Sequence, residues 1–145
     1  MEDCKPCSTP IENRLKLPKG NEQNRTAQPF RELVGCLSYA ALTTRPDLTA
    51  VVNFYSQLQS FPSDERWTHL KRILRYVKGS LGFGLVYRAD KAAPLLEFFS
   101  DADWANDSSD RRSVCGGVFK VFGNTVSWLT KPSNKPSLSR RPRQS

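Results

Sequence analysis

The chain has 145 residues, of which 38% are hydrophobic and 10% aromatic, so it is long and apolar enough for one modest domain and is not disordered throughout. The formal net charge is +8, but the last fifteen residues carry five basic and no acidic side chains, which leaves the body only mildly basic. Charge alone therefore gives weak support for nucleic-acid binding. No apolar run resembles a signal peptide or a membrane span, which predicts a soluble, intracellular chain (cytoplasmic or nuclear) with no membrane partner.

Two of the four cysteines, Cys4 and Cys7, form a CxxC pair near the start of the chain. This spacing can supply half of a zinc site or a redox pair. A four-ligand zinc site needs a second close pair, whereas Cys36 and Cys115 are isolated and His69 is the one histidine in the sequence. A redox pair is expected near a βαβ pattern, and this one lies in a proline-rich stretch. The sequence favours incidental reduced thiols without a shared function, and a zinc site or a redox pair are the alternatives.

Residues 1–28 are polar and proline-rich, which predicts an extended linker. Apolar residues then recur at three- and four-residue spacing, which predicts helices at 30–44, 47–60 and 64–78. Ser63 is expected to cap the third helix. The expected buried residues are Phe30, Leu33, Val34, Leu37 and Ala41, then Leu48, Val51, Val52, Tyr55 and Leu58, then Trp67, Leu70, Leu74 and Val77.

After Gly79 the apolar period shortens and β-branched and aromatic residues dominate. The expected strands are 83–88, 95–101, 114–122 and 125–129. Gly123 and Asn124 form a two-residue turn that would join the last two strands as a hairpin. Helices followed by strands predict the α+β class, with the strand at 95–101 paired to the strand at 114–122.

Four aspartates, Asp101, Asp103, Asp107 and Asp110, form the first candidate site. Asp101 closes an apolar strand, where a carboxylate is costly to desolvate and a divalent cation would offset that cost. Two-metal phosphodiester chemistry needs oxygen ligands fixed about 3.5–4 Å around a metal pair. The alternative, favoured by composition, is a solvated acidic turn.

The second candidate is a basic face on the third helix, which could neutralise phosphates without reading sequence. The alternative is a solvated charged face. His69 is expected at the surface or core boundary, and Trp67, Trp104 and Trp128 in or beside the core. The residues of the expected basic face are Arg66, Lys71, Arg72, Arg75 and Lys78.

Five blocks of sequence carry a resemblance to a known family. They are 1–10 (MEDCKPCSTP), 30–39 (FRELVGCLSY) with 44–48 (TRPDL), 69–79 (HLKRILRYVKG), 100–105 (SDADWA) with 111–113 (RRS), and 127–128 (SW). Together, and in this order over roughly residues 1–130, they resemble the Pol polyproteins of copia-type retrotransposons. Residues 1–10 are similar to the end of that family's reverse transcriptase domain.

The resemblance implies four segments. Residues 1–28 would be a linker from the end of the reverse transcriptase, and 29–80 a helical thumb- or connection-like region. Residues 81–130 would be a truncated ribonuclease H-like domain containing its first three strands, and 131–145 a basic disordered tail. The fold expectation is thus a three-helix segment followed by a partial ribonuclease H-like antiparallel sheet.

The resemblance also implies an activity. The family synthesises DNA on RNA and cleaves RNA–DNA hybrid with Mg²⁺, and its partners are hybrid or template–primer duplex and the rest of the polyprotein. Asp101 transfers as a metal-binding carboxylate, and Asp103 belongs to the same motif. The polymerase's paired aspartates have no match here, and after residue 139 the sequence departs from the family pattern that supplies a metal-binding glutamate.

These departures predict a catalytically inactive remnant with an incomplete metal site that holds no cofactor stably. Two alternatives are a non-specific nucleic-acid-binding module and part of an enzyme completed by another chain.

Overall fold

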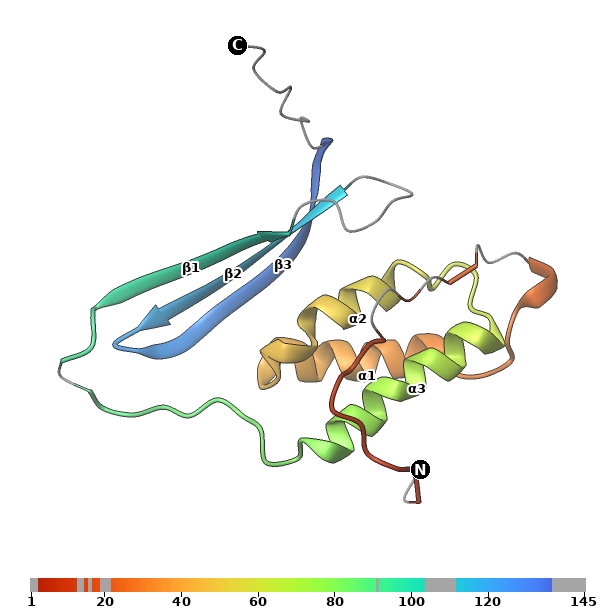
Figure 1. Cartoon of the computed structure of the whole chain (residues 1–145), viewed down its shortest axis with the longest axis horizontal. Helices are drawn as coiled ribbons and strands as arrows, with labels where there is room; N and C mark the ends of the chain where they lie inside the picture. The colour runs from red at the N-terminus through yellow and green to blue at the C-terminus, as the bar shows by residue number, and fades with distance from the viewer. Residues whose placement is uncertain are drawn as a thin grey trace, which may run out of the picture. The chain divides into compact units, whose positions relative to one another are not determined.

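The computed structural model describes residues 3–12, 15, 17–18, 22–90, 92–103 and 112–136. It divides into two compact units, Met1–Leu85 and Val86–Ser145. The first unit is helical and the second holds a three-stranded sheet (Figure 1). The predicted α+β class is therefore confirmed. Within the described ranges, no helix is long and apolar enough to cross a membrane.

The three predicted helices are present as α1 (Phe30–Thr43), α2 (Thr49–Ser56) and α3 (Asp64–Gly79). The second differs from its predicted bounds, because it opens with the 3₁₀ turn η2 (Pro46–Leu48) and ends at Ser56. Beyond that residue the amides of Leu58 and Gln59 bond to carbonyls three residues back, which tightens the chain into turns. A further 3₁₀ turn, η1 (Glu22–Asn24), precedes α1.

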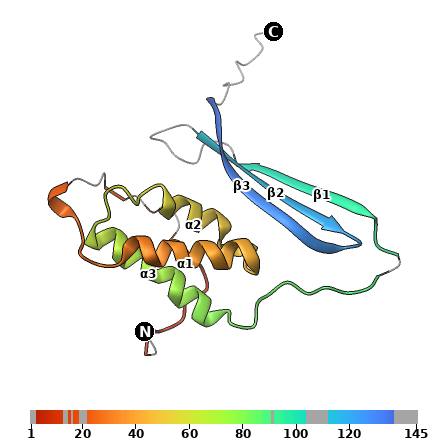
Figure 2. The ribbon, with the colours of Figure 1, turned by 180° about the vertical axis from the view of Figure 1, so that it is seen from behind.

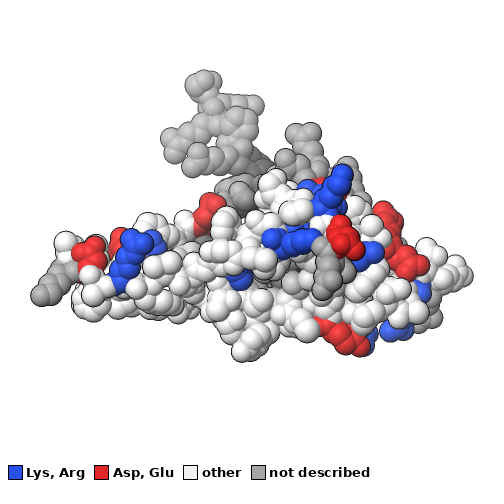
Figure 3. All heavy atoms as spheres, turned by 90° about the horizontal axis from the view of Figure 1, so that it is seen from below, with Lys and Arg blue, Asp and Glu red and all other residues white. Residues whose placement is uncertain are grey.

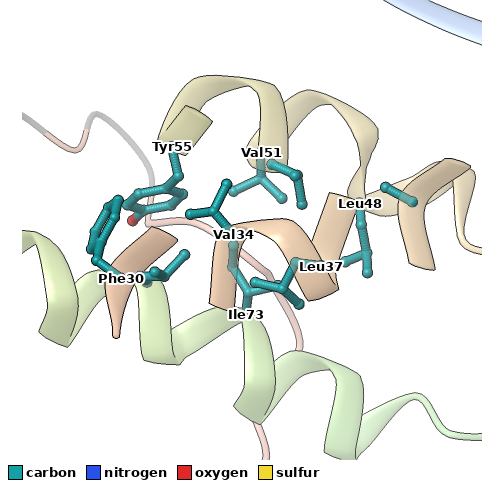
Figure 4. Close-up of a cluster of buried hydrophobic side chains, with 10 residues drawn as sticks. Phe30, Val34, Leu37, Leu48, Val51, Tyr55 and Ile73 are labelled. Atoms are coloured by element: carbon teal, nitrogen blue, oxygen red, sulfur yellow. The ribbon is translucent and has the colours of Figure 1, made fainter. Parts of the chain in front are cut away.

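The core of the helical unit lies where the three helices meet (Figure 4). Its members from α1 and α2 are those that the apolar spacing predicts, and Leu33 and Leu58 pack partly buried at its edge. In α3 the burial of Ile73 was not predicted, although Ile73 is as fully buried as Leu70. The buried hydrophobic residues are Phe30, Val34, Leu37, Ala41, Leu48, Val51, Val52, Tyr55, Leu70 and Ile73.

The start of α3 follows the expected chemistry. The Ser63 hydroxyl oxygen accepts a hydrogen bond from the Arg66 amide at 3.3 Å, which satisfies one of the free N–H groups at the helix start. Asp64 and Glu65 lie in the first turn, where the helix dipole favours negative charge. The predicted cap is confirmed.

The described part of residues 1–28, predicted as an extended linker, packs against the helical unit. Ile11 and Leu17 pack partly buried against the helical core. The Thr26 amide bonds to the Pro62 carbonyl at 2.8 Å, and Arg25 forms an isolated β-bridge with Ser63. These contacts come from a few apolar residues at irregular spacing, which leave no periodic signal in the sequence.

The sheet is antiparallel and has the order β1 (Leu96–Asp103), β2 (Arg112–Val121) and β3 (Asn124–Pro136) (Figures 1 and 2). The predicted pairing of its first two strands is confirmed by the register, in which Phe98 lies opposite Phe119. β3 continues to Pro136, so residues 131–136 are strand and not the disordered tail that the sequence predicted. The rest of that tail, 137–145, lies outside the described residues.

The predicted strand at 83–88 is wrong. These residues have no regular structure, and Phe83 and Val86 are exposed. The backbone of Arg88 is instead paired by a side chain: its N–H donates to Asn124 Oδ1 at 2.8 Å and its carbonyl accepts from Asn124 Nδ2 at 3.0 Å. One amide side chain therefore satisfies the groups that a neighbouring strand would have satisfied.

The turn between β2 and β3 lies one residue earlier than predicted. Val121 pairs with Asn124, which makes Phe122 and Gly123 the two turn residues. Both have positive φ, 46° and 73°, as a type I′ turn requires. Phenylalanine has a side chain that disfavours this left-handed conformation, so Phe122 is a strained position.

Phe122→Asn should stabilise the hairpin by about 1 kcal/mol, because asparagine tolerates positive φ and precedes glycine in the commonest type I′ turns. The measurement is amide hydrogen exchange at the β2–β3 pairs next to the turn. Phe122→Leu keeps the steric penalty and should leave protection unchanged. Lower protection in the asparagine variant would contradict the strain.

Burial raises the pKa of Tyr55 to about 12, assisted by the negative charge of Glu12 and opposed by Arg72. The unfolded hydroxyl ionises near its ordinary value of 10, so the stability from keeping Tyr55 neutral is complete below pH 10 and is lost as pH rises from 10 to 12.

We expect the helical unit to lose about 2 kcal/mol through this group by about pH 11.5. Tyr55→Phe should lack that part of the loss, whereas Tyr39→Phe, at an exposed position, should keep it. Urea unfolding followed by circular dichroism measures the difference. Equal alkaline losses in both variants would show that Tyr55 is not the titrating group.

Candidate functional site

Asp101 lies within β1, where its cross-strand partner is Gly116 of β2. Its side chain is exposed, and the strand continues past it to Asp103. The expectation of a carboxylate closing a buried strand is wrong, because Phe98 and Phe99 are 54% and 51% exposed. No desolvation cost therefore demands a cation beside Asp101.

The described acidic side chains do not fit a pair of Mg²⁺ ions. Gly116, opposite Asp101, offers no side-chain ligand. Within the described part of the chain, no three His, Cys, Asp or Glu side chains gather as a metal site. The side chain of Asp103 and the whole of Asp107 and Asp110 lie outside the described residues, as does Trp104.

Arg66 does not lie on an exposed basic face, which corrects its predicted placement. It is 5% exposed. Its Nη1 donates to the Phe61 carbonyl and its Nη2 to the Pro18 carbonyl, each at 2.7 Å. Nε has no hydrogen-bond partner among the described residues. The guanidinium joins the N-terminal segment to the start of α3, which is a structural role.

Three other basic residues of α3, Arg72, Arg75 and Lys78, lie beside residues 3–12, which we name the strap. Along the strap, successive residues contact α3 in reverse order, from Lys78 back to Arg72. Lys78 Nζ donates to the Cys4 carbonyl at 3.0 Å and Arg75 Nε to the Lys5 carbonyl at 2.8 Å.

Arg72 makes the largest share of the strap contacts. Its Nε donates to the Thr9 carbonyl at 3.1 Å, its Nη2 to the Thr9 hydroxyl at 3.0 Å, and its Nη1 to Glu12 Oε1 at 3.2 Å. In the other direction, the Cys7 amide donates to the Arg75 carbonyl at 3.3 Å. Three of the five cations predicted to bind phosphates thus donate to acceptors of the strap.

The fifth predicted residue, Lys71, lies over the ring of Trp67, with Nζ 5.9 Å from the ring centroid. Lysine and arginine side chains are interspersed with acidic ones on the face drawn in Figure 3. A single continuous positive stripe is therefore not what this face presents. Nucleic-acid binding by Lys71, Arg72, Arg75 and Lys78 stays a prediction, and the buried Arg66 no longer belongs to that set.

Cys4 and Cys7 are both free thiols within the strap. Cys7 Sγ lies 3.4 Å from the Thr9 carbonyl and 3.5 Å from the Arg72 carbonyl, as a weak donor. His69 is partly buried, at the core boundary that the sequence predicted.

A cluster of contacts around the buried Arg45 side chain, which we name the clasp, was not predicted from the sequence. The Arg45 guanidinium donates to both carboxylate oxygens of Asp47, at 2.9 and 2.7 Å, and to the carbonyl and hydroxyl of Ser80, at 3.2 and 2.7 Å. It also lies over the rings of Tyr76 and Phe83, 5.6 and 5.9 Å from their centroids. The clasp ties the α1–α2 connection to the end of α3.

The clasp perturbs its ionisable members. The Arg45 hydrogen bond holds the pKa of Asp47 below its ordinary value, against the opposing effect of burial, and the Tyr76 hydroxyl adds a 2.9 Å bond. The Asp47 hydrogen bond raises the pKa of Arg45. Burial, with Asp47, raises the pKa of Tyr76. The polar side chains of the clasp hydrogen-bond to one another, which indicates a structural role.

Comparisons with known proteins give relatives of three kinds. A retrovirus-related Pol polyprotein from a Nicotiana tabacum transposon is 35% identical over 96% of this chain and 11% of its own length. An uncharacterized mitochondrial protein of Arabidopsis thaliana is 38% identical over 97% of this chain and 57% of its own length. A secreted RxLR effector protein of Plasmopara viticola is 41% identical over 77% of this chain and 78% of its own length.

No family model matches the chain, and no solved structure matches it. The chain is similar to transposon polyproteins over at least nine-tenths of its length. The chain belongs to the retrovirus-related Pol polyproteins of copia-type transposons. It spans about a tenth of the length of the transposon polyproteins that it matches.

Asp47→Asn should lower the free energy of unfolding by about 1–3 kcal/mol at pH 7, because it leaves the buried Arg45 charge without a counter-charge. The folded pKa of Asp47 lies below the ordinary 3.8, so its contribution is present above pH 3.8 and lost as pH falls through the folded value.

The gap between the parent chain and the Asp47→Asn variant should therefore narrow in acid. Urea unfolding at about pH 7 and about pH 3 measures it. Glu32→Gln removes an exposed carboxylate of the same unit and serves as the control. A gap that stays constant with pH would mean that the Arg45–Asp47 charge pair does not stabilise the fold.

Proposed function

We propose that the chain is the part of a copia-type polyprotein that joins reverse transcriptase to ribonuclease H and that it has no hybrid-cleaving activity by itself. The helical unit would be a thumb- or connection-like region, with template–primer duplex as its partner in the polyprotein. The sheet would be the opening strands of a ribonuclease H-like fold. The similarity over 90–97% of the chain to transposon polyproteins and one mitochondrial relative supports this assignment.

The observation that carries the proposal is the setting of Asp101. It lies in the first strand of a three-stranded antiparallel meander, which is where the resemblance puts the first metal-binding carboxylate. In this chain that carboxylate is exposed and faces a glycine across the strand pair. Two-metal hydrolysis needs several carboxylates around two ions, and a single exposed carboxylate holds Mg²⁺ weakly.

The helical unit supports a structural part in the same proposal. Its cationic side chains hold the strap, and Arg45 and Arg66 tie together segments that are distant in sequence. This is how a connection between two catalytic domains would keep its shape while its neighbours act.

The purified chain should show no metal-dependent cleavage of RNA–DNA hybrid in Mg²⁺ or Mn²⁺. Its Mg²⁺ affinity should be millimolar or weaker and almost unchanged in Asp101→Asn. A gel assay on labelled hybrid and a calorimetric Mg²⁺ titration measure the two quantities.

Asp90→Asn, which alters another exposed aspartate, is the control for both assays. Metal-dependent cleavage that vanishes in Asp101→Asn and persists in Asp90→Asn would overturn the inactivity and show that Asp101 works with other ligands.

A further inference from the structure

We propose that the strap, residues 3–12, masks a phosphate-binding row formed by Arg72, Arg75 and Lys78, so that a nucleic-acid duplex binds α3 only when the strap moves away. This inference rests on the proposed function, in which template–primer duplex is the partner. It adds a regulatory contact within the chain: the row has two alternative sets of acceptors, the strap's own oxygens and the phosphates of a duplex.

The spacing of the row suits a phosphate backbone. Arg72, Arg75 and Lys78 follow one another at three-residue intervals on the last turns of α3. Six residues of helix span about 9 Å along the axis. A nucleic-acid strand rises about 3.4 Å per phosphate, so the row covers roughly two to three phosphates. Phosphate contacts of this kind bring affinity and carry no base code.

Each cation of the row gives at least one of its donors to the strap. Lys78 Nζ, Arg75 Nε and Arg72 Nε each donate to a strap carbonyl, at 3.0, 2.8 and 3.1 Å. The same N–H group cannot serve a carbonyl and a phosphate with full strength. Strap docking and duplex binding therefore compete for the same hydrogens.

A phosphate is the stronger acceptor for these cations. The strap's carbonyl acceptors are neutral, and the Arg72 and Arg75 bonds to them are exposed to solvent. A phosphate oxygen carries charge, so binding to it adds a charge–charge attraction that the neutral carbonyls lack, and a duplex also releases counterions as it binds. The Glu12 carboxylate, 3.2 Å from Arg72, opposes a phosphate by charge as well as by position.

The two ends of the strap are held by different kinds of contact. Its early residues are held by polar contacts, whereas Ile11 packs against the helical core. The end near Ile11 can therefore stay anchored while residues 3–9 leave the helix. The masking segment would remain attached close to its docking surface and return when the duplex dissociates.

Gly79 allows the strap to be displaced without removing a cation. A Cβ at this position would lie 3.1 Å from Pro6 Cβ and 3.2 Å from the Cys7 carbonyl oxygen, so a larger side chain pushes against the strap. Gly35, in α1, has nothing within 4 Å of its added Cβ. Gly79→Leu and Gly35→Leu therefore make the same chemical change on two helices, one beneath the strap and one in open space.

The experiment measures the affinity of the full chain for an RNA–DNA hybrid of about 20 base pairs, at about 50 mM and about 200 mM salt. Gly79→Leu should bind about tenfold more tightly than the parent at the lower salt, with a steeper salt dependence, because each freed cation adds roughly 0.9 to the slope. Gly35→Leu should match the parent. Adding Arg72→Gln and Arg75→Gln to Gly79→Leu should return binding to the parent level.

Hydrogen exchange of the Cys7 amide, which bonds to the Arg75 carbonyl, reports the strap's position in the same samples. Ile11→Ser, which removes the apolar anchor without adding charge, is a second way to release the strap. Tighter binding in a variant that loses Cys7 protection supports the proposal, and unchanged binding in such a variant overturns it.

Three further outcomes would also overturn the proposal. One is Cys7 protection that persists in both release variants, and another is tighter binding that survives the two glutamine changes. The third is equal tightening by Gly35→Leu. The hybrid-cleavage assay depends on Asp101 and not on α3, so failure of the masking and failure of the proposed inactivity give different results.

Discussion

The burial of Leu70 and Ile73 against α1 and α2 is the contact on which the helical unit depends. Both side chains are fully buried, and together they fix the rotation of α3 about its own axis. That rotation decides the position of every other side chain on the helix. It puts Arg66 into the interior and brings Arg72, Arg75 and Lys78 to the strap.

Helix periodicity predicted α1 and most of the core because each apolar stripe is regular. The same periodicity also indicates the burial of Arg66. Arg66, Leu70, Ile73 and Val77 follow at four, three and four residues, which places Arg66 on the buried stripe. Its acceptors could not be predicted, since the Pro18 and Phe61 carbonyls belong to irregular segments.

Two further predictions, the strand at 83–88 and the open basic face of α3, failed at places where partners distant in sequence form the hydrogen bonds. The Asn124 side chain pairs with the backbone of Arg88, at the end of the β-rich sequence 83–88 that forms no strand. Carbonyls of the strap satisfy cations that composition alone would assign to solvent or to phosphates. Neither exchange has a period, and both depend on residues tens of positions apart. Asp101 differs: the sequence found its strand, but it could not find the exposure of that strand or the glycine opposite.

The strap also constrains the order of folding. Thr9 and Cys4 contact partners 63 and 74 residues later in the chain, so the segment made first pairs with the helix made last in the helical unit. At a synthesis rate of about 5–20 residues per second, the strap waits roughly 3–15 seconds for α3 to appear. Over that interval the Cys4 and Cys7 thiols have no helix beside them. Docking of the strap is therefore a late event of loop closure across the whole unit, separate in time from the formation of each helix.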